Sequence, residues 1–281
     1  MVGVKNPRRD EGVNGTRLAF ELDRSIFPAK AKYKDPFVEK MCRYYSYLNP
    51  ALTNQVINLG FGTDTLTLAG TNGNFNISVS GGNLTVIGAT AAVDEHINLL
   101  NVQVNPSTFD LGAGTDDSLT LFGQAGFSNN VTVKNVETVT GTSFSDTITI
   151  ANTSGTTTVT AGFDGDNITA SAGVDHIRYT SVGDSQSSLG GAHDIVTNFD
   201  AANDAFVFGP GVGLQNNTIS FVGSNAFDGG GVSEARLETS GGQTILQIDV
   251  DGDGAMTAND MVIELHNQTG GLLSNSNFLL G

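Results

Sequence analysis

Three stretches of the chain repeat one layout, and this repetition is the strongest constraint on the fold. They are "INLGFGTDTLTLAG" (57–70), "FDLGAGTDDSLTLFG" (109–123) and "VTGTSFSDTITIAN" (139–152), each with a small-residue turn, an Asp, and threonines alternating with Leu or Ile. Gly permits the positive φ of tight turns, and strict alternation places Leu or Ile on one face of a strand and Thr on the other. We therefore expect stacked β-units that bury Leu66/Leu68, Leu119/Leu121 and Ile148/Ile150 on one face.

The composition agrees with an all-β fold. The chain has 36 glycines, no Trp and a single Cys, and short apolar runs are interrupted by Gly, Asn, Asp, Ser and Thr. This pattern is typical of turn-rich β-proteins. We expect a Gly/Asp-rich parallel β-solenoid or β-roll over residues 56–180, a C-terminal β cap over 181–281, and a short helical or extended arm over 1–55.

A tighter period appears in "TAGFDGDNITASAGVDHI" (160–177). Asp166 and Asp175 are nine residues apart there, and a glycine-containing turn precedes each. A nine-residue unit of turn and short strand is the calcium-binding β-roll repeat G-G-x-G-x-D-x-U-x. We expect carboxylates of adjacent turns, with Asp164, to face each other across a gap that a divalent cation neutralises.

The most acidic loop is "IDVDGDGAMTAND" (248–260). It fits the linear calcium loop D-x-[DN]-x-[DN]-G-x₅-E except in its last ligand, which is Asp instead of Glu. The positions are Asp249, Asp251 and Asp253 at one, three and five, Gly254 at six, the Ala255 carbonyl at seven, Thr257 at nine and Asp260 at twelve. An acidic hairpin turn without metal is the alternative.

A second acidic segment and two isolated turns add weaker candidates. "DIVTNFDAANDAF" (194–206) contributes possible calcium ligands that are also ordinary turn and cap residues. These are Asp194, Asp200, Asn203 and Asp204. The turns at Asp64 and Asp116 have no adjacent copy in the sequence, so a structural role and half of a metal site both stay open for them.

Charge is unevenly distributed. Residues 1–50 hold ten of the 13 Lys+Arg, whereas residues 51–281 hold three against 23 acidic residues. Nucleic-acid contacts need Lys and Arg, so we expect no nucleic-acid partner for the large acidic part. Cations are its natural partners.

The basic segment differs from the rest in other ways. It carries four of the five tyrosines, and Asp35-Pro36 begins a helical pattern. This helix would pack on the β-domain or dock on a surface or partner. We expect no transmembrane segment and no N-terminal signal peptide, and Cys42 alone cannot form an intrachain disulfide.

The sequence predicts no enzyme. H-E-x-x-H, G-x-S-x-G and P-loop motifs do not occur. Carboxylates are so numerous that a glycosidase or lyase pair would be hidden among them, and this alternative stays open.

Taken in order, five stretches resemble the RTX family of calcium-binding bacterial proteins secreted by type I systems. They are "NVETVTGTSFSDTITI", "AGFDGDNITASAGVDHIRYTSVGDS", "HDIVTNFDAANDAFVF", "TILQIDVDGDGAMTANDMVIEL" and "LLSNSNFLLG". The third and fourth follow the order of the serralysin-type C-terminal domain, and the last resembles the apolar end of a type I secretion signal. The chain departs from the family in one respect: it has only one clear pair of nine-residue repeats, whereas the family has a ladder of them.

This resemblance implies Ca²⁺ as cofactor, the type I export machinery as partner, and an extracellular or cell-surface location. We therefore expect a non-enzymatic protein that is secreted unfolded and folds on calcium. The alternative is a self-assembling, calcium-dependent subunit of a surface layer, filament or adhesive matrix, with residues 1–50 as anchor or self-association arm.

Overall fold

The computed structural model describes residues 55–68, 73–79, 82–101, 103, 105–186 and 192–281. These residues all belong to one compact unit, residues 47–281. The expected basic arm, residues 1–55, lies outside the described residues except for its last position.

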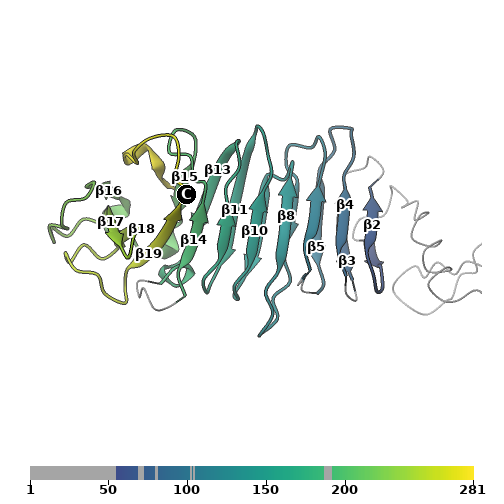
Figure 1. Ribbon diagram of the computed structural model, residues 1–281, viewed down its shortest axis with the longest axis horizontal. Coiled ribbons are helices and arrows are strands. Elements are labelled where there is room, and N and C mark those ends of the chain that lie inside the picture. Colours follow the sequence, from purple (N-terminus) through teal and green to yellow (C-terminus); the bar gives the residue numbers. More distant parts are fainter. Residues whose placement is uncertain (1–54, 69–72, 80–81, 102, 104, 187–191) are drawn as a thin grey trace, which may run out of the picture. The chain divides into compact units, whose positions relative to one another are not determined.

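Two long sheets build this unit, and Figure 1 shows their strands side by side, in sequence order from β2 as far as β14 and then in the order β19, β18, β17, β16. The nine-stranded sheet contains β1 (Gln55–Asn58), β3 (Gly73–Ser78), β5 (Glu95–Leu99), β7 (Ser118–Thr120), β9 (Thr138–Thr142), β11 (Thr156–Gly162), β13 (Val174–Tyr179), β15 (Ala205–Phe208) and β20 (Phe278–Leu280). The 11-stranded sheet contains β2 (Asp64–Thr67), β4 (Leu84–Ile87), β6 (Ser107–Asp110), β8 (Asn130–Lys134), β10 (Thr147–Ile150), β12 (Asn167–Thr169), β14 (Asp194–Thr197), β19 (Met261–His266), β18 (Gln243–Asp249), β17 (Glu234–Ser240) and β16 (Ser220–Phe221).

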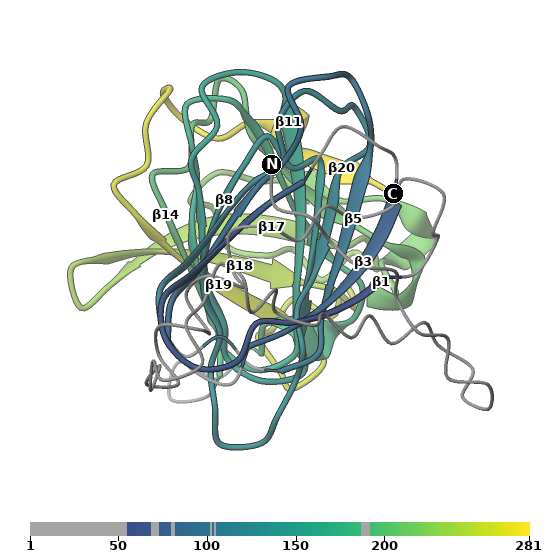
Figure 2. The same ribbon diagram turned by 90° about the vertical axis from the view of Figure 1, so that its right-hand side faces the viewer.

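The chain alternates between the two sheets, so each coil contributes one strand to each of them. Neighbouring strands of the coils pair in parallel, for example Thr158 with Thr138 and Ile148 with Ile168. Figure 2 looks along the stack, where the strands of successive coils overlie one another. The expected all-β parallel solenoid is therefore confirmed.

The core lies between the two sheets. Leu66, Leu119 and Ile148, with the second apolar residue of each repeat, are buried as the alternation predicts. Val131, Val133 and Val139 extend the same layer. Each coil alone has too little apolar surface to be stable, so stacking supplies the burial.

Residues 181–281 continue both sheets. β14 and β15 add a further strand to each sheet, and β19 pairs with β14 in parallel before β18 and β17 turn the sheet antiparallel. Short 3₁₀ helices, η1 (Val182–Asp184), η2 (Pro210–Val212), η3 (Gln215–Asn217) and η4 (Asn275–Asn277), lie in the connections. The expected C-terminal cap is thus part of the same unit and has no separate core.

The C-terminal apolar segment is folded into the stack. β20 pairs with β15 in parallel, and Phe278 packs against the rings of Phe206, Phe208 and Phe221. This strand is the last of the nine-stranded sheet. Among the described residues, no helix is long and apolar enough to cross a membrane.

Buried carboxyl groups connect successive coils where the chain enters each strand. The backbone N–H of Asn129 donates to Asp146 (3.1 Å), that of Asp146 to Asp166 (2.7 Å), and that of Asp166 to Asp194 (2.9 Å). These four side chains are at most 1% exposed. We call this row of side-chain to backbone hydrogen bonds the carboxylate ladder.

A second ladder follows the nine-stranded sheet. The N–H of Glu95 donates to Asp117 (2.6 Å), that of Asp117 to Glu137 (2.7 Å), and that of Asp175 to Asp204 (2.8 Å). Several of these aspartates also close their own turn, as Asp175 does by accepting the N–H of Ser171 (2.6 Å). A buried carboxylate therefore satisfies backbone donors on two coils at once, which water cannot do there.

Removal of one ladder carboxylate should destabilise the whole stack. Asp146→Ala leaves the N–H groups of Asn129 and Thr142 without their acceptor, so we expect the free energy of unfolding to fall by about 3 kcal/mol. Urea unfolding followed by circular dichroism measures it. The matched control is the exposed Asp116→Ala, with a loss below about 0.5 kcal/mol; equal losses in both variants would contradict a structural role for the ladder.

Candidate metal centre

The acidic loop connects two antiparallel strands of the 11-stranded sheet. β18 ends at Asp249 and β19 begins at Met261, and Ile248 pairs with Met261 at the base of the loop. Residues 250–260 therefore start and end at neighbouring points of a rigid sheet. This closes a short loop in which several carboxylates must approach one another.

Glycine is required at two positions of the loop. Gly252 and Gly254 have φ of 68° and 84°, a region that favours residues without Cβ. A Cβ on Gly252 would lie 2.7 Å from the Val232 nitrogen, and one on Gly254 would lie 2.9 Å from the Gly229 Cα. The loop thus packs tightly on the neighbouring segment 228–232, and the Gly231 N–H donates to the Gly252 carbonyl (3.0 Å).

Asp249 is the buried carboxylate of the loop. Its Oδ1 accepts the N–H of Gly252 and its Oδ2 accepts the N–H of Gly254, both at 2.8 Å. Burial raises its pKa, the two N–H donors counteract this, and the charge of Asp260 adds to the rise. A cation beside Asp249 would relieve both unfavourable contributions.

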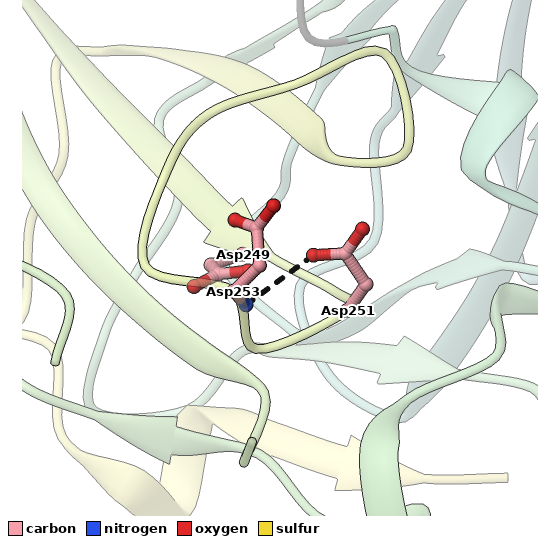
Figure 3. A group of neighbouring side chains, drawn as sticks. All are labelled: Asp249, Asp251 and Asp253. Carbon is pink, nitrogen blue, oxygen red and sulfur yellow. Dashed lines mark hydrogen bonds between the residues drawn. The ribbon is translucent and has the colours of Figure 1, made fainter. Parts of the chain in front are cut away.

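Asp251 and Asp253 lie nearer to solvent, and Figure 3 shows both around the same turn as Asp249. Asp251 accepts the N–H of Asp253 (3.3 Å), and Asp253 accepts the N–H of Ala255 (2.8 Å). One carboxylate oxygen from each of the three aspartates lies within 4.8 Å of the others.

This spacing suits calcium. Two oxygens that each lie about 2.4 Å from one Ca²⁺ are separated by at most about 4.8 Å. Three carboxylates also supply the hard, anionic oxygen ligands that Ca²⁺ prefers. The residues at positions one, three and five of the expected loop therefore lie close enough together to form a candidate site for one ion.

Asp260 and Thr257 are placed differently. Both oxygens of Asp260 face the loop's own backbone: Oδ1 accepts the Val250 N–H (2.8 Å), and Oδ2 accepts the N–H (2.6 Å) and hydroxyl (2.9 Å) of Thr257. Among the described residues, the carboxylate group that meets a metal-sized spacing contains Asp249, Asp251 and Asp253 and not Asp260. Ligation by Ala255, Thr257 and Asp260 stays a prediction.

Asn259 also contributes to the loop, although the calcium-loop pattern gives its position no role. Its side-chain amide donates to Oδ2 of Asp251 (3.0 Å), which orients that carboxylate from the far side of the loop. A polar residue just before the twelfth loop position was the available signal. It is weak, because Asn is common in any turn.

The nine-residue pair Asp166 and Asp175 belongs to different sheets. Asp166 precedes β12, whereas Asp175 lies within β13. Nine residues therefore correspond to the crossing from one sheet to the other. The Asp166 carboxyl accepts the Asp146 N–H one coil away, whereas the Asp175 carboxyl accepts from Ser171 in its own turn and the Asp175 N–H donates to Asp204 one coil away. Asp164 is exposed beside the turn with a φ of 75°.

The second acidic segment divides in the same way. Asp194 and Asp204 are buried members of the two ladders, and burial raises the pKa of Asp194 to about 8 and that of Asp204 to about 6. Asp200 accepts the Ala202 N–H (3.0 Å) and the Asn203 amide (2.8 Å) in an exposed turn. Calcium ligation by these three residues stays a prediction, and their visible role is to satisfy backbone and turn donors.

The strain at Gly254 generates a testable expectation. Gly254→Ala and Gly213→Ala place Cβ at the same φ of 84°, but the first meets the 228–232 segment while the second meets open space. We expect Gly213→Ala to cost about 1–2 kcal/mol of unfolding free energy and Gly254→Ala at least about 1 kcal/mol more. Thermal unfolding at equal calcium compares the two, and equal costs would show that the loop moves freely off its neighbour.

No family model matches this sequence, and a search of curated proteins finds no match either. The case for a function therefore depends on the geometry of the acidic loop and on the fold that carries it.

Proposed function

We propose that the chain is a non-catalytic, extracellular calcium-binding protein of RTX type, which is exported unfolded by a type I system and folds when it meets calcium. The observation that carries this proposal is the approach of Asp249, Asp251 and Asp253 within one loop. The remaining support comes from the charge of the chain and from the parallel coil architecture.

The charge balance makes the folded state sensitive to cations. Residues 51–281 contain 23 acidic residues and only three basic ones, so repulsion among the negative charges opposes compaction of the chain. An ion that binds the folded chain but not the unfolded chain shifts the equilibrium toward folding by mass action. Extracellular calcium at about millimolar concentration suits loops of this kind.

The loop also has a structural position from which calcium would act on the cap. It lies between β18 and β19, and β19 is the strand that joins the cap to β14 of the coil stack. Neutralising three carboxylates there would favour closure of the β18–β19 hairpin. Calcium in this loop would thereby stabilise the C-terminal end of the 11-stranded sheet.

Two aspartates offer a matched test of the site. Asp253 and Asp228 are both exposed, each precedes a Gly, and each accepts an N–H two residues along the chain, from Ala255 and Gly230 respectively. Asn preserves that acceptor in both, so Asp253→Asn and Asp228→Asn remove the same charge with little change of structure. Asp249→Asn is less informative, because an amide in place of either Asp249 oxygen would oppose the N–H of Gly252 or Gly254.

We expect Asp253→Asn to weaken calcium binding by about tenfold or more, because ligand charge sets affinity in such loops. Asp228→Asn should retain the affinity of the natural chain within about threefold. Isothermal calorimetry with calcium, on the full chain, measures both. Unchanged affinity in Asp253→Asn, or equal losses in the two variants, would remove this loop from the proposal.

Export has a separate test at the C-terminus. Deletion of residues 272–281 should retain the chain inside a bacterium that carries a type I exporter, but it also removes β20 from the fold. Phe278→Ala is the control, since it disrupts the aromatic contacts of β20 while keeping the segment. We expect the deletion to abolish secretion and Phe278→Ala to permit it, because export acts on the unfolded chain. Secretion of the shortened chain, measured by immunoblot of the medium, would contradict the proposal that residues 272–281 belong to a secretion signal.

A further inference from the structure

A second group of acidic residues lies far from the acidic loop, in the third and fourth coils. Glu95 begins β5 and Asp117 immediately precedes β7, and both side chains are 0% exposed. The Glu95 N–H donates to Asp117 Oδ1 (2.6 Å), and Glu95 Oε1 accepts the Ala89 N–H (3.1 Å). This leaves Glu95 Oε2 and Asp117 Oδ2, to which no N–H or O–H of the described residues donates.

The surroundings offer these two atoms little compensation. Asp94 and Glu137 add negative charge near the pair. His96, whose Nδ1 forms a hydrogen bond with the Ser118 hydroxyl (2.8 Å), acts in the opposite direction and lowers the pKa of Asp117. The ion pairs of lysine and arginine among the described residues lie elsewhere, at Asp110 and Glu238.

The backbone of the preceding turn also covers Asp117. A Cβ on Gly114 would lie 2.5 Å from Asp117 Oδ2 and 2.5 Å from the Val93 carbonyl. The turn therefore passes directly over the carboxyl group and shields it from solvent.

We propose that Glu95 and Asp117 share one proton in mildly acidic medium, and that this proton joins the third coil to the fourth. A hydrogen bond between the two carboxyl groups would pair the orphaned oxygens, because the Asp117 carboxyl lies beside Glu95 and accepts its N–H. Two carboxylates have no hydrogen to donate, so such a bond forms only when one of them is protonated. One proton then satisfies both orphaned oxygens and removes one of two buried like charges.

The direction of the pH response follows from this arrangement. Burial, followed by the Asp117 charge, raises the pKa of Glu95 to about 7, and burial also raises the pKa of Asp117. Because the pKa of Glu95 is higher in the folded chain, the shared proton stabilises the fold fully below the pKa of the unfolded chain, near 4.5. This stabilisation is lost as pH rises through about 7. The contact between these coils should loosen as the medium turns from mildly acidic to mildly alkaline, whether or not calcium is bound elsewhere.

A carbon-detected NMR titration of the side-chain carboxyl carbons in the full natural chain tests the proposal directly. We expect one proton of the Glu95–Asp117 pair to titrate near pH 7, with both carboxyl resonances responding together. Titration of both groups below pH 5 would overturn the proposal. A shift of both resonances on adding calcium at pH 7.5 would also overturn it, because a cation would then take the place of the proton.

Hydrogen exchange provides the functional readout. In the natural chain, protection of the Glu95 and Asp117 amides, corrected for intrinsic exchange, should fall about tenfold between pH 6 and pH 8.5. In Glu95→Gln the side-chain amide can donate to the Asp117 carboxyl at every pH, so this pH-dependent fall in protection should disappear. Asp116→Asn removes a neighbouring exposed charge, and the pH-dependent fall in protection should persist in this variant. A pH-dependent fall that persists in Glu95→Gln contradicts the shared proton, and the titration of the natural chain decides the matter if Glu95→Gln fails to fold.

Discussion

The structure depends on buried carboxyl groups that accept backbone N–H donors from the preceding coil. Strand pairing satisfies the backbone within the two sheets, but the corners between them have N–H groups with no strand partner. Asp146, Asp166 and Asp194 fill that need along one edge of the stack. Burying charge is unfavourable, and the rise in the pKa of Asp166 to about 9 reflects it. A proton or a cation therefore has a favourable effect wherever such a carboxyl lacks enough donors.

This single constraint explains how one acidic chain supports different local chemistries. In the ladders each carboxyl group accepts a backbone N–H of the neighbouring coil, although Oδ2 of Asp166 has no donor among the described residues. At Glu95 and Asp117, two neighbouring members of the second ladder, one oxygen of each carboxyl group lacks a donor, which favours a shared proton. In the acidic loop three approach one another close to solvent, where an ion can enter. The residue type is the same in each case, and the number of available donors and the access to solvent decide the outcome.

The C-terminus links the fold to the proposed route of export. Phe278 is packed among aromatic rings and β20 completes the nine-stranded sheet. Because β20 is paired with β15 and Phe278 is buried, a secretion signal in this segment would be presented as free chain before folding and as part of the stack afterwards. Export of an unfolded chain followed by folding outside fits that order of events, and calcium binding at the β18–β19 loop would favour the second step.

The sequence by itself determined the fold class and the loop. Alternation around Leu66, Leu119 and Ile148 specifies which face is buried, because side-chain direction in a strand has a period of two. The Asp-x-Asp-x-Asp-Gly spacing brings Asp249, Asp251 and Asp253 together because all three lie on one short turn. Only the tertiary structure decided the partners of Asp166, Asp175 and Asp194, which lie one coil away. It also decided the approach of Glu95 to Asp117. Coil length varies from one coil to the next, and register between coils depends on how the whole stack packs, so these pairings cannot be read from local spacing.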